Sequence, residues 1–249
     1  MDFYGYVNTV QLDDQDINLN DYPFNIPGIH NLKKLSFHPK VTYLIGENGM
    51  GKSTLLEAIA VGLGFNAEGG SKNFNFDTQA THSDLHRHLR ISKGVCRMKD
   101  GFFLRGESFY NVASEIDKLD SEPSFSGRRI IDSYGGKSLH KQSHGESFWT
   151  LFMNRFQGSG LYILDEPESA LSITRQMAML SQMDKLIHHN SQFIIATHSP
   201  VVLAYPDAAI YQMTEQGINQ VKYKETDLYR LYKGFLDNPE QMTSILMDE

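Results

Sequence analysis

The segment Gly46–Ser53 constrains the fold of this chain more than any other, because it reads GENGMGKS and matches the phosphate-binding pattern G-x-x-x-x-G-K-S. An apolar, β-rich run, Val41–Ile45, precedes it, and a helix-like run, Lys52–Leu63, follows it. Glycines let the backbone turn sharply and approach a phosphate without a Cβ in the way. The pattern therefore predicts a strand, a phosphate-binding loop (the P-loop, Gly46–Ser53) and a helix, in that order.

The P-loop predicts a nucleoside triphosphate as ligand. Successive backbone N–H groups would face the phosphates, and the N-terminus of the following helix would add positive potential. Lys52 would reach the β- and γ-phosphates, and the Ser53 hydroxyl would bind Mg²⁺. The predicted nucleotide-binding residues are Gly46, Glu47, Asn48, Gly49, Met50, Gly51, Lys52, Ser53 and Thr54.

Two adjacent carboxylates end the apolar run in Leu161–Pro167, which reads LYILDEP. A short continuous apolar run fits a strand buried on both faces of a parallel sheet. Asp165 and Glu166 would then emerge at the carboxyl edge, where ligands bind in open α/β sheets. Asp165 suits the Mg²⁺ shell, and Glu166 suits polarising a water for attack on the γ-phosphate. The competing interpretation is an exposed turn that happens to carry acids.

A second buried strand is predicted at Gln192–Ala196, and it ends in Thr197-His198-Ser199-Pro200. His198 therefore also stands at a strand's carboxyl end, where it could hydrogen-bond the γ-phosphate. Between the two strands, Ile173–Ile187 carries apolar residues at 3–4 spacing and predicts an amphipathic helix.

The segment Ser143–Ser147 reads SHGES and precedes a run whose apolar residues share one helical face. Ser143 and Gly145 would therefore stand at a helix N-terminus, where an anion could bind. A plain helix cap without a ligand explains the same residues.

The region between these motifs is harder to assign. Gly94–Leu104 alternates like a hairpin around Lys99-Asp100-Gly101, a strong turn signal, with Phe102–Leu104 as a strand. Further upstream, Tyr22 and Phe24 precede the P-loop by a little over twenty residues, and either could stack on adenine or simply pack in the core.

Length and composition set outer limits. The chain has 249 residues, 40% of them hydrophobic, which suits one large domain. A net charge of -7 argues against a generally DNA-coating surface. The single cysteine, Cys96, and the absence of a signal-like or membrane-spanning run favour a cytoplasmic protein without membrane insertion.

Four motifs, GENGMGKS, SHGES, LYILDEPESAL and ATHSP, follow one another in an order that resembles the ATP-binding-cassette (ABC) ATPase superfamily. The chain is most similar to the soluble branch that contains SMC, Rad50 and RecF-type heads and small stand-alone predicted ATPases. The resemblance spans roughly residues 20 to 215. It implies an α/β P-loop NTPase fold with a mainly parallel central sheet, flanking helices and an N-terminal antiparallel β subdomain. Residues 1–249 would form one domain, with a helical and loop insert at about 64–140.

The resemblance also implies roles for individual residues. Lys52 belongs to the Walker A motif, Asp165 is the Walker B aspartate, Glu166 the catalytic glutamate and His198 the switch histidine. Ser143 and Gly145 correspond to signature residues that bind the γ-phosphate held by the opposite subunit. The signature is altered, because Gln142, His144 and Glu146 replace its Leu, Gly and Gln. No Gln follows the strand at Phe102–Leu104, so Arg105 or Glu107 would stand in for the Q-loop residue.

These correspondences predict an ATPase that uses ATP and Mg²⁺, works as an ATP-dependent homodimer and drives or signals to a protein partner. DNA repair and phage defence are one setting, although the net charge gives DNA binding no support. The nucleotide-binding subunit of an ABC transporter is the alternative. A module that binds ATP without turnover is disfavoured by the intact Glu166 and His198.

Overall fold

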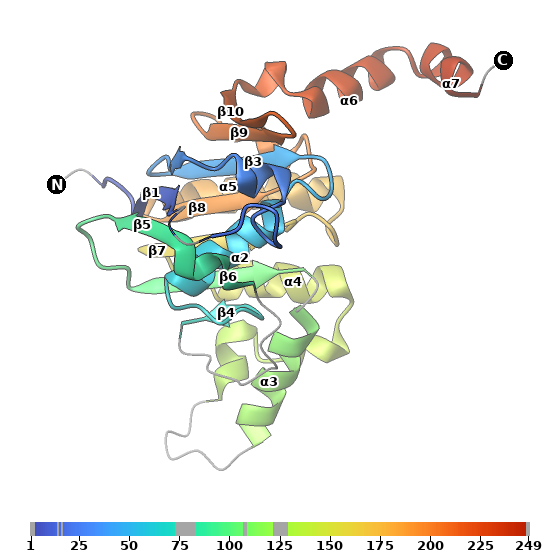
Figure 1. Ribbon diagram of the computed structural model, residues 1–249. Helices are drawn as coiled ribbons and strands as arrows, with labels where there is room; N and C mark the ends of the chain where they lie inside the picture. The colour runs from blue at the N-terminus through green and yellow to red at the C-terminus, as the bar shows by residue number, and fades with distance from the viewer. Residues whose placement is uncertain are drawn as a thin grey trace.

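The computed structural model describes residues 3–13, 15, 17–72, 83–106, 109–121 and 129–247. At its centre is a seven-stranded sheet with the strand order β10-β9-β3-β8-β7-β6-β4 (Figure 1). The neighbours from β9 to β6 pair in parallel, whereas β10 and β4 are antiparallel strands at the two edges. The strands are β3 (Val41–Gly46), β4 (Gly70–Ser71), β6 (Asp100–Arg105), β7 (Gly160–Asp165), β8 (Gln192–Ala196), β9 (Ala209–Thr214) and β10 (Gly217–Val221). The expected mainly parallel α/β sheet is confirmed.

Helices cover both faces of this sheet, and each face has its own hydrophobic core. Alternate residues of β3 point to opposite sides: Tyr43 and Ile45 join one core, and Leu44 joins the other. The first core contains side chains of α3 (Phe109–Ser121), α4 (His144–Asn154) and α5 (Ile173–His188). The second contains those of α2 (Lys52–Gly62). Burial on both faces explains why β7 and β8 are continuous apolar runs.

A separate three-stranded antiparallel sheet, ordered β2-β1-β5, packs on the α2 side and confirms the expected N-terminal β subdomain. Its strands are β1 (Val7–Leu12), β2 (Lys34–Ser36) and β5 (Leu89–Lys93), with the short α1 (Pro27–His30) between β1 and β2 in the sequence order. The side chain of Gln192 links the two sheets, because its amide oxygen accepts from the backbone of Tyr6 and Val7 at 2.7 and 2.9 Å.

The hairpin expected around Asp100-Gly101 is wrong. Strand β5 pairs with β1, whereas β6 pairs with β7, so the two segments belong to different sheets. Gly101 is needed for packing, because a Cβ there would lie 2.9 Å from the Phe65 ring. Asp100 accepts hydrogen bonds from Arg155 at 2.7 Å and from the Tyr162 hydroxyl at 2.8 Å. The segment 64–140 thus supplies β4, β5 and β6 to the two sheets, besides helix and loop.

The remaining elements are short 3-10 turns and two C-terminal helices. Helix α6 (Asp227–Asp237) and helix α7 (Pro239–Met247) extend away from the body of the molecule (Figure 1). Among the residues that the structure describes, no helix has the length and apolarity needed to cross a bilayer. The 3-10 turns are η1 (Asp84–His88), η2 (Ile130–Tyr134), η3 (Leu139–Lys141), η4 (Val202–Ala204) and η5 (Tyr223–Glu225).

Candidate functional site

The P-loop connects the end of β3 to the start of α2, as the motif predicts. Two of its glycines stand where a larger side chain would collide with neighbouring residues. Gly46 has φ 147°, and a Cβ there would lie 2.4 Å from the carbonyl oxygen of Met213 on β9. Gly51 caps α2 in the left-handed conformation at φ 93°, and a Cβ there would lie 2.7 Å from the Ile26 side chain. Side chains at these positions would push the loop off the sheet edge.

The side chain of Lys52 folds back over the P-loop. Its Nζ donates to the carbonyl oxygens of Gly46 at 2.8 Å and Glu47 at 2.9 Å. Burial lowers the pKa of Lys52, while the nearby carboxylates of Glu166 and Asp165 oppose this shift. An ammonium group is therefore held over the loop in which phosphates would bind, with acids close by.

Ser53 and Asp165 meet at the carboxyl edge of the sheet. The Ser53 hydroxyl donates to Asp165 Oδ1 at 3.1 Å. Burial raises the pKa of Asp165 to about 6, and the Glu166 charge adds to this effect, whereas the Ser53 hydrogen bond and Arg105 oppose it. A hydroxyl beside a buried carboxylate that lacks a full counter-charge is a donor set that suits a hard divalent cation. The pair therefore fits the predicted magnesium site.

Glu166 begins the turn after β7 and takes a left-handed conformation that is uncommon outside glycine, with φ 48°. Its backbone N–H donates to Ala196 at 2.9 Å, which anchors the turn to the end of β8. Its carboxylate lies 3.4 Å from Nε2 of His198, and the two side chains are 43% and 38% exposed. The structure thus brings together the two groups predicted to act on the attacking water and the γ-phosphate.

Arg105 ends β6 directly beside Asp165 in the parallel register. Its guanidinium forms an ion pair with the buried Glu57 of α2. Arg105 therefore contributes positive charge at the sheet edge near Asp165, as well as holding α2 against β6. Glu107, the other residue proposed for the Q-loop position, lies outside the described residues.

The SHGES segment forms the N-terminus of α4, as predicted. Ser143 and Glu146 make a capping box: Ser143 Oγ accepts from the Glu146 backbone N–H at 3.4 Å, and the Glu146 carboxylate accepts from the Ser143 N–H at 3.0 Å. The Ser143 hydroxyl also donates to this carboxylate at 2.8 Å. These hydrogen bonds lower the pKa of Glu146. Gly145 lies against the turn after β7, because a Cβ there would be 2.2 Å from the carbonyl oxygen of Ala170. The segment is thus built as a cap and packs on the Glu166 turn.

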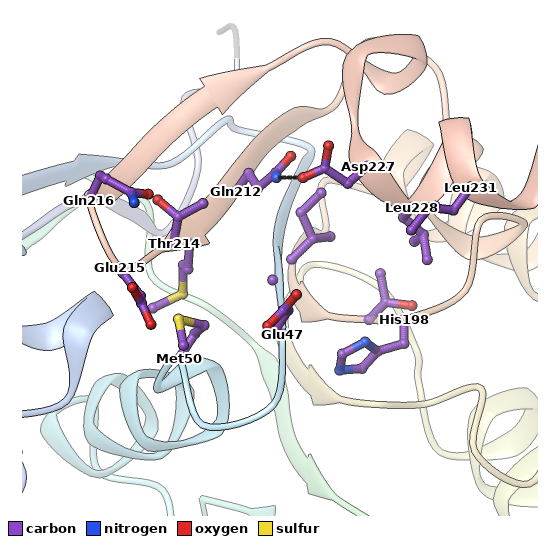
Figure 2. Close-up of a pocket in the computed structure, with 14 residues that line it drawn as sticks. Glu47, Met50, His198, Gln212, Thr214, Glu215, Gln216, Asp227, Leu228 and Leu231 are labelled. Atoms are coloured by element: carbon purple, nitrogen blue, oxygen red, sulfur yellow. Dashed lines mark hydrogen bonds between the residues drawn. The ribbon is translucent and has the colours of Figure 1, made fainter. Parts of the chain in front are cut away.

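A cavity of about 360 Å³ adjoins the P-loop and His198 (Figure 2). Its far wall is formed by the β9–β10 turn and the first part of α6, including Thr214, Asp227 and Leu231. Asp227 accepts a hydrogen bond from the Gln212 amide across this wall. The sequence motifs gave no sign of this wall, because its residues follow no known binding pattern.

The two aromatic residues considered for adenine differ in environment. Phe24 is buried and packs edge-to-face on His88, with ring centroids 5.2 Å apart. The Tyr22 side chain is 68% exposed. Packing therefore explains Phe24, and stacking on adenine stays a prediction for Tyr22.

Comparison with known proteins identifies the family of this chain and some of its relatives. The family model described as AAA domain (AAA_23) matches residues 23–190. An uncharacterized ABC transporter ATP-binding protein of Haemophilus influenzae is 27% identical over 216 residues, which cover 81% of each chain. The vitamin B12 import ATP-binding protein BtuD of Vibrio cholerae is 29% identical over 176 residues, covering 64% of this chain and 68% of that protein.

Among solved structures, a nucleotide-free ATP-binding cassette from an ABC transporter has the same fold. It superimposes with a TM-score of 0.54 at 14% identity and covers 94% of this chain and 96% of its own. Because the family match spans more than half of the 249 residues and includes the P-loop, Asp165 and Glu166, the chain belongs to the AAA_23 family of AAA-domain proteins and is a P-loop ATPase.

Proposed function

We propose that the chain hydrolyses ATP as a nucleotide-sandwiched homodimer, in which each ATP lies between the P-loop of one copy and the SHGES segment of the other. The observation that supports this most is the convergence of Lys52, Ser53, Asp165, Glu166 and His198 at one sheet edge. These residues come from distant parts of the chain, and together they supply the groups that phosphoryl transfer to water requires.

Each side chain then has a defined task. Lys52 places positive charge beside the β- and γ-phosphates, and Glu166 orients the attacking water and accepts its proton. His198 Nε2 has no hydrogen-bond partner among the described residues, so it is available to donate to the γ-phosphate. Ser53 and Asp165 would hold Mg²⁺, which when bound neutralises charge on the phosphate oxygens.

The exposure of the site argues for closure by a second copy. The Glu166 side chain is 43% exposed, so a single chain leaves the carboxylate that would act on the water open to bulk solvent, whereas Nε2 of His198 is buried. Phosphoryl transfer is faster where closure excludes water and adds fixed dipoles. The N-terminus of α4 in a second copy would supply such a dipole. ATP binding would then close the dimer, and hydrolysis would open it, a change that a partner protein could detect.

The test is the mass of the Glu166→Gln variant in solution with and without ATP and Mg²⁺. This change keeps the shape of the side chain and removes the proton acceptor, so the closed dimer should accumulate. Light scattering coupled to gel filtration should show a dimer with ATP and a monomer without it. A Lys52→Ala/Glu166→Gln double variant, which lacks the phosphate contact, should stay monomeric. A Glu166→Gln protein that stays monomeric with ATP would contradict the sandwich.

The ATPase could serve a membrane transporter or could act in DNA repair or phage defence, and its partner distinguishes the two roles. The names of the curated relatives favour a transporter subunit, whereas the altered signature residues Gln142, His144 and Glu146 weigh against one. ATPase stimulation by DNA that weakens with salt would support repair or defence. Co-purification with a membrane permease would support transport.

A further inference from the structure

Glu168, two residues after Glu166, has no task in the mechanism above. Its Oε1 accepts a hydrogen bond from the backbone N–H of His198 at 2.6 Å. Its Oε2 is buried and has no hydrogen-bond partner among the residues that the structure describes. Burial raises the pKa of Glu168, although hydrogen bonds from the His198 backbone and the Thr197 hydroxyl oppose the shift. Burying a carboxylate costs folding free energy unless hydrogen bonds compensate for the lost hydration, so the hydrogen bond to His198 is the contact to explain.

The contact to His198 continues the pairing of two parallel strands beyond their ends. Asp165 of β7 is paired with Ala196 of β8, and the Glu166 N–H donates to the Ala196 carbonyl at 2.9 Å. At Glu166 the backbone turns away, so the β7 segment makes no further ladder bond to the residues after Ala196. The Glu168 side chain reaches back and accepts the His198 N–H instead.

The turn that carries Glu168 is itself closed by backbone hydrogen bonds. Ser169 N–H donates to the Glu166 carbonyl at 3.1 Å, and Leu171 N–H donates to the Glu168 carbonyl at 2.8 Å. Glu168 is therefore fixed relative to Glu166, and His198 is fixed relative to Glu168. Glu168 thus connects the turn that carries Glu166 to the loop that carries His198, and Glu166 Oε1 lies 3.4 Å from His198 Nε2.

We propose that Glu168 is a positioning residue, whose Oε1 clamps the His198 loop to the Glu166 turn and so sets the distance between the two reacting side chains. The inference rests on the proposed function, because it takes Glu166 and His198 as the side chains that act on the water and the γ-phosphate. Glu168 itself makes no contact with ATP in this proposal. Glu168 acts as a hydrogen-bond acceptor here, so an amide oxygen in the same place should serve nearly as well as the carboxylate.

A matched pair of variants tests this clamp in the full-length protein. Glu168→Gln keeps an acceptor, whereas Glu168→Met keeps the length of the side chain without one. Glu168→Met should lower kcat roughly 10- to 100-fold, because misplacing a catalytic group by about 1 Å has effects of this size. The KM for ATP and the binding of a fluorescent ATP analogue should stay close to wild type. Glu168→Gln should restore most of kcat.

A double-mutant cycle with His198 tests whether the loss of kcat in Glu168→Met acts through His198. In a His198→Ala background, Glu168→Met should cause little further loss of kcat, because the group that it positions is already gone. Equal losses in both backgrounds would overturn the clamp, as would equal kcat values for Gln and Met at position 168. Loss of ATP binding in Glu168→Met would assign the residue to the fold or the nucleotide pocket and would also overturn it. A wild-type protein without ATPase activity would instead contradict the proposed function.

Discussion

The Ser53 hydroxyl lies 3.1 Å from Asp165 Oδ1, although 112 positions separate the two residues in the sequence. The contact joins the first turn of α2 to the end of β7 across the carboxyl edge of the sheet. Burial raises the pKa of Asp165 to about 6, and the Ser53 hydrogen bond and the charges of Arg105 and Lys52 oppose this shift only in part. The carboxylate therefore opposes folding when it is ionised and no cation is bound.

Asp165→Asn should stabilise the metal-free protein at neutral pH. The pKa of Asp165 rises from 3.8 to about 6 on folding, so its ionisation weakens the folded state as pH rises through this interval and has no effect below about pH 4. The gain in unfolding free energy of the variant should reach up to about 3 kcal/mol at pH 7, at about 1.4 kcal/mol per pKa unit. Denaturant unfolding in EDTA from pH 4 to pH 8 measures it. A variant less stable than wild type at pH 7 would rule out this reading of Asp165.

Gly145→Ala should destabilise the junction between α4 and the Glu166 turn. The added Cβ would lie 2.2 Å from the Ala170 carbonyl oxygen, so one backbone segment must move. Overpacking of this kind costs about 1–3 kcal/mol. Gly234→Ala in α6 is the matched control, because a Cβ there meets nothing within 4 Å. Thermal unfolding should show a lower Tm for the first variant and an unchanged or higher one for the control; equal shifts would show that the close approach is unimportant.

Glu146→Gln should strengthen ATP-dependent dimerisation. The Glu146 carboxylate stands in the first turn of α4 and binds the Ser143 hydroxyl, so it would repel a γ-phosphate that approaches this helix end. The amide removes the charge and keeps an acceptor for the Ser143 hydroxyl. Sedimentation at increasing ATP should show dimer at lower nucleotide concentration for this variant. Glu240→Gln, in the first turn of α7, is the control. Weaker dimerisation of Glu146→Gln would mean that the carboxylate supports the interface.

The sequence predicted those parts of the site at which backbone packing and phosphate binding call for the same type of residue. At Gly46 and Gly51 the motif calls for glycine so that a phosphate can approach the backbone. The fold calls for glycine at the same positions, because a Cβ would collide with Met213 or Ile26. Asp165 ends the buried strand β7, His198 follows the end of the buried strand β8 by two residues, and the ends of parallel strands meet at one edge. A short apolar run followed by a polar residue was therefore enough to predict their meeting.

Features that depend on long-range packing were missed. The Asp100-Gly101 pair has the composition of a turn, but Gly101 makes room for Phe65 and Asp100 binds Arg155 and Tyr162. Partners so distant in the sequence leave no local signal. Glu168 belongs to the LYILDEPESAL motif, but the motif does not reveal its contact with the His198 backbone, which depends on how β7 and β8 end.

Lys52→Ala tests the central claim most directly, because the proposed function assigns the Lys52 ammonium, held over the P-loop, to the β- and γ-phosphates. Steady-state ATP hydrolysis by the purified variant should fall on the order of 100-fold or more, as expected for loss of a charged transition-state contact. The variant should keep the wild-type circular dichroism spectrum and Tm within a few degrees. A folded Lys52→Ala protein that hydrolyses ATP as fast as wild type would contradict the account.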